Sequence, residues 1–302
     1  MSETPTASTS IFPTIPIPQP IRRFFDAFPL LTLPPTPLPA RSPAASNVPS
    51  LYVFSTPENV AAGKPSFNPA CLKWQTYLML SGIEFQSIPS SNHASPSGSL
   101  PFLRPGAAES NEQSKPVTSA HLVQWVKDHG KPSQDVDPSN PELVAFTTLL
   151  DTRIRDAWLY ALYLEPRNFN TLAIKQYCQT AIPLVNKLLA WEYRNSAFKE
   201  LCKTRPGAVL SSIDIYADAD SAFSSLATLL ADQGGDWFFG AAEPGLFDAT
   251  VYSYTHLILT LPWDRRAATL QHTLRKYDIL VAHERRLHAL TFARDRRKKS
   301  SS

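Results

Sequence analysis

Cysteine is scarce in this chain of 302 residues, which contains only Cys71, Cys178 and Cys202. Three is an odd number and no Cys-x-x-Cys pair occurs, so the sequence indicates neither a disulfide framework nor a thiolate zinc site. The histidines form no His-Glu-x-x-His run and no spacing that matches the cysteines. We therefore expect no metal ion and no cofactor.

A long apolar run is also missing. The longest one, 251–261, is interrupted by Ser253, Thr255 and His256 and is shorter than the roughly 18 to 20 residues that a spanning helix needs. The N-terminus shows no basic segment followed by an apolar run, so no secretory signal is expected. Any contact with a membrane is expected to be peripheral or through a partner.

Charge is unevenly distributed along the chain. The net charge is +3, and residues 264–302 hold eleven basic against four acidic side chains. The terminal cluster Arg294–Lys299 is a candidate for contact with anionic lipid at a membrane surface. Because aromatic residues do not alternate with these charges, we expect no nucleic-acid partner.

Proline is abundant in residues 1–50, which hold twelve of the 28 prolines, so this segment is predicted to be an arm and not a domain. Within it, one helical side carries Ile21, Phe24, Phe25 and Phe28. This pattern fits two alternatives, a disordered tail or a docking helix that orders on a partner. We treat these four residues as a partner-binding hypothesis.

Residues 51–131 read as a small α/β domain. A strand at 51–54 is followed by a helix that begins at Asn68-Pro69, and a second strand is predicted over 83–88. Pro101 heads the next apolar run, which favours either an edge position or a cis bond that opens a strand. An amphipathic helix then ends at Gly130. The order of these elements is typical of a thioredoxin-like layer.

Residues 132–293 read as entirely helical. Asn140-Pro141 begins a long helix that ends at Pro166, and Pro183 is expected to break or kink the next helical region, 172–201. A helix over 212–230 follows, and the last helix or pair of helices is basic, over 265–292. Residues 294–302 form a basic tail.

The stretch 236–261 is the element around which we expect the chain to be organised. Gly245 stands at the N-cap of its helix, and Asp248, three residues on, can reach back to the Gly245 N–H. The helix is apolar on nearly every side, as helices inside a bundle are. His256 within it is expected to be a core histidine bonded to a neighbour.

The run FFG-x-x-x-P-x-x-x-D at 238–248 and the order of elements resemble the glutathione transferase superfamily. The runs 65–72, 95–103 and 156–169 are similar to metaxins, in particular to the smaller, cytosol-facing, fungal-type subunits of the mitochondrial sorting and assembly machinery. The resemblance covers residues 51–290 and implies a glutathione-transferase-like fold, α+β/α. In that fold a small N-terminal thioredoxin-like domain precedes an all-helical C-terminal domain.

An enzyme of this fold needs a Tyr, Ser or Cys at the first strand-to-helix junction, a cis-proline beside the tripeptide backbone, and an acid with a hydroxyl at a later helix start. Ser55 or Ser66 can fill the first place and Pro101 the second. The third place, 116–120, contains no acid, which leaves the ammonium group of glutathione without a partner. Cys71 is predicted to be a packing residue and not a nucleophile.

We therefore predict a chain that is not an enzyme, with a glutathione transferase as the alternative. The metaxin resemblance implies a peripheral protein on the cytosolic face of the mitochondrial outer membrane. Its implied partners are an outer-membrane insertase β-barrel, a second metaxin-like subunit and β-barrel precursor proteins whose insertion it assists.

Overall fold

The computed structural model describes residues 47–106, 115–131, 136–178, 180, 182–205 and 210–293. These residues belong to one compact unit, Ala45–Ser302. The predicted partner-binding residues Ile21, Phe24, Phe25 and Phe28 lie outside the described residues, and so does the basic cluster 294–299.

A four-stranded sheet forms the first layer of the fold, in the order β2-β1-β3-β4. β1 and β2 are parallel, whereas β3 is antiparallel to both β1 and β4. The sequence analysis offered two alternatives for the strand after Pro101, an edge position or a cis bond. The edge position is wrong, because β3 has a neighbouring strand on each side. The other alternative holds, since the Leu100–Pro101 bond is cis. The strands are β1 (Ser50–Val53), β2 (Gln86–Pro89), β3 (Phe102–Arg104) and β4 (Val117–Thr118).

The second strand begins later than the sequence predicts, at Gln86 and not at Ile83. The preceding helix ends in a Schellman arrangement in which Gly82 N–H donates to Met79 and Ile83 N–H donates to Leu78. Gly82 adopts a φ of 70°, a conformation that glycine reaches without steric cost. The residue after this glycine is therefore tied to the helix end and not to the sheet.

The helices extend from the α/β layer into an all-helical region, and no helix among the described residues is long and apolar enough to cross a membrane. They are α2 (Pro57–Ala61), α3 (Pro69–Leu80), α4 (Leu122–His129), α5 (Pro141–Leu149), α6 (Arg155–Leu159), α7 (Pro166–Asn168), α8 (Ile174–Tyr177), α9 (Pro183–Thr204), α10 (Ser212–Asp232), α11 (Leu246–Thr260), α12 (Thr269–Leu274) and α13 (Asp278–His288). Together, the sheet layer and the helical region confirm the predicted fold class.

Two short elements escape the sequence analysis, α2 and β4. The signal for α2 is present, because Thr56 accepts from Asn59 N–H at 3.3 Å as an N-cap and Pro57 follows at the first helical position. The strand β4 has only two residues, which is too short for any alternation of polar and apolar side chains to appear. The segment 116–120, which the sequence suggests as a helix start, is therefore strand and turn.

Helices begin or break at the prolines, as the sequence predicts. Asn140 caps α5 by accepting from Glu142 N–H at 2.9 Å. The helical backbone then continues to Leu164 through α6 and two π-helical turns, 150–154 and 160–164. Pro183 breaks the next region, so that α8 ends at Tyr177 and α9 begins at Pro183 itself.

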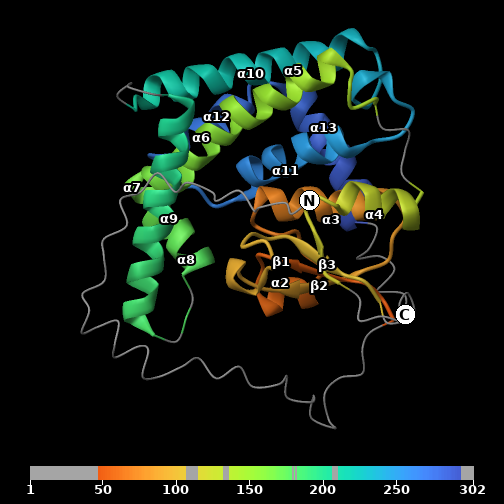
Figure 1. Ribbon diagram of the computed structural model, residues 1–302. Helices are drawn as coiled ribbons and strands as arrows, with labels where there is room; N and C mark the ends of the chain where they lie inside the picture. The colour runs from red at the N-terminus through yellow and green to blue at the C-terminus, as the bar shows by residue number, and fades with distance from the viewer. Residues whose placement is uncertain are drawn as a thin grey trace, which may run out of the picture. The chain divides into compact units, whose positions relative to one another are not determined.

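Helix α11 is the central element of the core, as the sequence predicts. It packs along α3 of the sheet layer and also contacts α12 and α13 (Figure 1). Ala249, Val251, Tyr252 and Ile258 are fully buried. Burial of each large apolar side chain stabilises the folded state by about 1.5 to 3 kcal/mol. The buried side chains of α11 therefore contribute much of the free energy that holds the sheet layer and the helical layer together.

Asp248 fixes the start of α11 with more contacts than the sequence reveals. Its Oδ2 accepts from Gly245 N–H at 3.1 Å, which is the expected cap contact, and its Oδ1 accepts from Phe238 N–H at 3.1 Å. His283 of α13 donates from Nε2 to the same Oδ1 at 2.8 Å, and its side chain is completely buried. One carboxylate thus connects the loop before α11, the cap and α13.

We expect Asp248→Ala to reduce the free energy of unfolding by about 3 to 5 kcal/mol, because it leaves a buried histidine and two N–H groups without their acceptor. Loss of a helix cap alone would cost about 1 to 2 kcal/mol. Urea denaturation measures the difference. The matched control is Asp278→Ala, an exposed aspartate in the first turn of α13, which should cost less than about 1 kcal/mol. Equal losses in the two variants would contradict the network.

Candidate functional site

A cavity of about 250 Å³ lies beside the segment that connects β1 to α3. One wall comes from the segment that leads into α3, and the opposite wall comes from α8 and the C-terminal half of α11. The lining residues are Thr56, Asn59, Lys64, Pro65, Ser66, Phe67, Lys175, Gln176, His256, Leu257, Thr260 and Leu261.

The two serines at this junction are not placed for chemistry. Ser66 is fully buried, and its hydroxyl donates to Phe54 O at 2.5 Å and accepts from Asn68 N–H at 3.2 Å. The Ser55 hydroxyl is buried and makes no hydrogen bond within the described part of the chain. Ser66 therefore holds the turn that leads into α3, and the buried Ser55 oxygen presents no surface to a ligand.

Cys71 is a packing residue, as the sequence predicts. It is completely buried, and the Phe54 N–H points at its sulfur at 3.5 Å. Burial raises the pKa of the Cys71 thiol to about 12, although the Phe54 N–H and the Ser66 hydroxyl act in the opposite direction. A thiol with so high a pKa contains almost no thiolate near neutral pH, and the thiolate is the nucleophile.

Aromatic rings close the junction from the helical side. The Tyr177 ring meets Phe54 and Phe67 edge-on at 5.0 and 5.1 Å, and its hydroxyl donates to Phe67 O at 3.4 Å. Tyr163 lies 5.9 Å from the same ring. Burial raises the pKa of Tyr177, so its phenol stays protonated. These contacts pack aromatic side chains against Phe54 and Phe67, on either side of the Ser66 turn.

The backbone beside the cis-proline is also engaged. Pro101 has no N–H, so the N–H of Leu100 is the donor next to the cis bond. This N–H donates to the side-chain oxygen of Asn92 at 3.0 Å. A tripeptide that paired with the backbone here would have to displace Asn92.

The turn between β4 and α4 supplies no partner for an ammonium group. Residues 116–121 contain no acidic side chain. The Thr118 hydroxyl lies 3.1 Å from His121 Nδ1 and is thus used within the turn. The acid-and-hydroxyl pair that holds the amino-acid end of glutathione is absent from this segment.

A larger cavity, of about 410 Å³, lies beside the loop that precedes α11. Its walls are largely apolar, and it contains Lys73, whose pKa is lowered by burial and raised less strongly by Asp151. Ser55, Ser66 and Pro101 do not line it. It is therefore separate from the residues on which glutathione chemistry would depend.

Two models of known protein families match parts of this chain. Residues 69–168 match the glutathione S-transferase N-terminal domain, and residues 219–287 match the glutathione S-transferase C-terminal domain. The chain has a glutathione-transferase-like fold. No curated protein matches it in sequence.

Solved structures share the transferase fold at low sequence identity. The glutathione transferase GSTFuA3 from Phanerochaete chrysosporium is 12% identical, with 80% of this chain and 98% of that chain covered and a TM-score of 0.50. The beta-etherase LigF from Sphingobium sp. strain SYK-6 is 15% identical over 83% and 99%, with a TM-score of 0.51. A glutathione S-transferase of Ceriporiopsis subvermispora in complex with glutathione is 14% identical over 81% and 98%, with a TM-score of 0.53. These identities establish the fold alone.

Sequence reasoning missed two features of this region. Asn92 stands in a loop rich in Ser and Asn, and nothing in its spacing points to the Leu100 N–H eight residues away. The second feature is the contact of His256 with Glu284, which lies 28 residues further along the chain. The sequence predicts a neighbour for His256 but not which one, because only the pairing of α11 with α13 brings the two side chains together.

We expect a thiol reagent to modify the half-exposed Cys202 in the native chain and to leave Cys71 untouched until denaturant is added. Because burial raises the pKa of Cys71 to about 12, the native chain offers the reagent almost no Cys71 thiolate between pH 7 and 9. Labelling followed by peptide mass spectrometry reports each site. Cys202→Ser should abolish the fast reaction, whereas Cys71→Ser should leave it unchanged. Loss of the fast reaction in Cys71→Ser would show that the Cys71 thiol is reactive.

Proposed function

We propose that this chain is a non-catalytic binding protein that uses the transferase fold as a scaffold. The observation that carries the proposal is the hydrogen bond from Leu100 N–H to Asn92 at 3.0 Å, because the protein itself occupies the backbone donor beside the cis-proline. The buried Cys71, the engaged Ser66 and the lack of an acid at 116–121 support it. The first two concern the side chain that would hold the thiol of glutathione, and the third concerns its ammonium group.

An exposed apolar stripe on α9 supports a binding role. Leu184, Leu188, Trp191 and Phe198 share one side of this helix and are 76, 62, 65 and 48% exposed. The face of α9 that packs on the protein is a different one and carries Ala190, Ala197 and Leu201. Large apolar side chains in a continuous exposed row mark interaction surfaces in soluble proteins. We call these four residues the α9 stripe.

The finer part of the proposal follows the metaxin resemblance. We propose that the α9 stripe docks on a membrane-embedded insertase β-barrel of the mitochondrial outer membrane, from the cytosolic side, beside a second metaxin-like subunit. In this role the chain receives β-barrel precursors and assists their insertion. The arm residues Ile21, Phe24, Phe25 and Phe28 are proposed as a second contact with the same partners.

The first test is glutathione binding by the full chain. We expect no detectable heat of binding in calorimetry at millimolar glutathione, which corresponds to a binding free energy weaker than about −4 kcal/mol, and no conjugation of a chloronitrobenzene substrate. A glutathione transferase assayed in parallel is the positive control. Binding accompanied by turnover would support the alternative, a transferase-type enzyme.

The second test concerns the α9 stripe. Leu188→Ser combined with Trp191→Ser should weaken co-purification with the barrel partner from mitochondrial membranes by at least about tenfold, since each anchor contributes about 1.5 to 3 kcal/mol when buried. The matched control is Ile213→Ser on α10, which is 79% exposed and lies outside the stripe. Both variants should keep the parent melting temperature. If the double variant associates as the parent chain does, the contact is elsewhere.

A further inference from the structure

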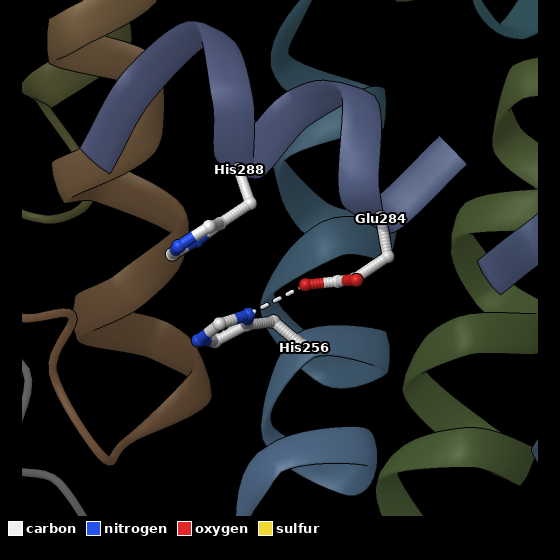
Figure 2. A group of neighbouring side chains, drawn as sticks. All are labelled: His256, Glu284 and His288. Atoms are coloured by element: carbon white, nitrogen blue, oxygen red, sulfur yellow. Dashed lines mark hydrogen bonds and ion pairs between the residues drawn. The ribbon is translucent and has the colours of Figure 1, made fainter. Parts of the chain in front are cut away.

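Three potential metal ligands converge between α11 and α13, and Figure 2 shows them. His256 comes from α11, whereas Glu284 and His288 lie one turn apart on the same side of α13. His256 Nδ1 donates to Glu284 Oε1 at 2.7 Å. One ligand atom of each residue lies within 4.8 Å of the others. Two imidazoles and one carboxylate are thus close neighbours between the two helices.

The position of the cluster is unusual for such polar groups. His256 and Glu284 are each only 7% exposed, where α11 packs against α13. The imidazole rings of His256 and His288 are stacked, with centroids 4.9 Å apart and planes 11° apart. Burial of an ionisable group is costly unless it is paired or coordinates a metal. The hydrogen bond from His256 uses one carboxylate oxygen of Glu284. The second carboxylate oxygen can also serve as a metal ligand.

Tyr252 orients one of the rings. Its hydroxyl lies 2.9 Å from His288 Nδ1, and its side chain is completely buried. The Phe292 ring also stacks with the His288 ring, with centroids 5.9 Å apart. Metal-binding histidines in proteins are commonly fixed in this way by a hydrogen bond at the ring nitrogen that does not hold the metal.

The cluster lies beside a cavity. His256 belongs both to the cluster and to the wall of the 250 Å³ cavity at the β1–α3 junction. The cluster therefore borders this cavity through His256. Three protein ligands with one open position are the arrangement of zinc sites that keep a water molecule or bind a further ligand.

We propose that His256, Glu284 and His288 bind one divalent transition-metal ion of the zinc class. Imidazole nitrogens favour Zn²⁺ and its first-row neighbours over Mg²⁺ and Ca²⁺, which prefer oxygen ligands. Ligand atoms in a tetrahedral zinc site lie about 3 to 3.5 Å apart, so side-chain rotation has to bring the three atoms closer. The ion replaces the hydrogen bond between His256 and Glu284: it takes the Nδ1 lone pair, and the ring proton moves to Nε2, so that the imidazole binds in its neutral form.

The sequence gives little sign of this site. His283-Glu284-x-x-x-His288 has one residue too many for the His-Glu-x-x-His pattern of zinc-binding helices. His283 instead bonds to Asp248 and belongs to the cap network. Glu284 and His288 then turn toward α11, which supplies the third ligand.

The test is zinc binding by the metal-stripped full chain without an affinity tag. Competition with a chromogenic zinc chelator should give one Zn²⁺ per chain with a Kd at or below about 1 μM, and Co²⁺ should give the visible absorption of a tetrahedral site. His256→Ala, Glu284→Gln and His288→Ala should each weaken binding at least tenfold. His272→Ala, which removes an exposed histidine of α12, should bind as the parent chain does.

A second readout separates binding from folding. Zn²⁺ should raise the melting temperature of the parent chain and of His272→Ala but not of the ligand variants, even where a variant has a lower melting temperature without metal. Tyr252→Phe should keep the fold and weaken zinc binding about tenfold, because it frees the His288 ring. Absence of one bound equivalent in the parent chain, or equal binding by parent and ligand variants, overturns the proposal.

Discussion

The carboxylate of Asp248 is the interaction on which the arrangement of the helical layer depends. It accepts hydrogen bonds from the Phe238 N–H, from the Gly245 N–H at the helix cap and from the His283 side chain, which is 35 residues further along the chain. The same contacts hold the Phe238–Gly240 turn, in which Phe239 adopts a φ of 60° and is the only non-glycine residue of the described chain with a positive φ. A single buried acid thus determines how the chain enters α11 and how α13 crosses it.

Much of the fold could be predicted from local sequence signals. Asn68-Pro69 and Asn140-Pro141 mark helix starts that the structure contains, and Pro183 marks a predicted break, because caps and prolines act on the adjacent backbone. The start of β2 could not be predicted in the same way, since the Schellman bonds after α3 take up the backbone of Ile83. The two residues of β4 become a strand only by pairing with β3.

Part of the candidate site could also be predicted, because some of its properties depend only on which residue types are present. The missing acid at 116–120 and the packing role of Cys71 follow from residue types alone. The partner of the Leu100 N–H does not, because Asn92 reaches it through a loop whose course the sequence does not specify. The convergence of His256 with Glu284 and His288 needs the crossing of two helices, which no pattern within either helix encodes. Local chemistry is therefore predictable here, and side-chain contacts between distant segments are not.

The packing of α11 on α3 has a consequence for cooperativity. One continuous apolar cluster runs from Leu51 in the sheet to Phe292 after α13, so neither layer has a core of its own. The hydroxyl of Tyr177, near the end of α8, adds a polar connection to Phe67 in the loop before α3. Removal of either layer would expose the apolar face of the other to water. The two layers thus form a single folding unit, and the domain arrangement by itself gives no place at which the chain can be cut into autonomous halves.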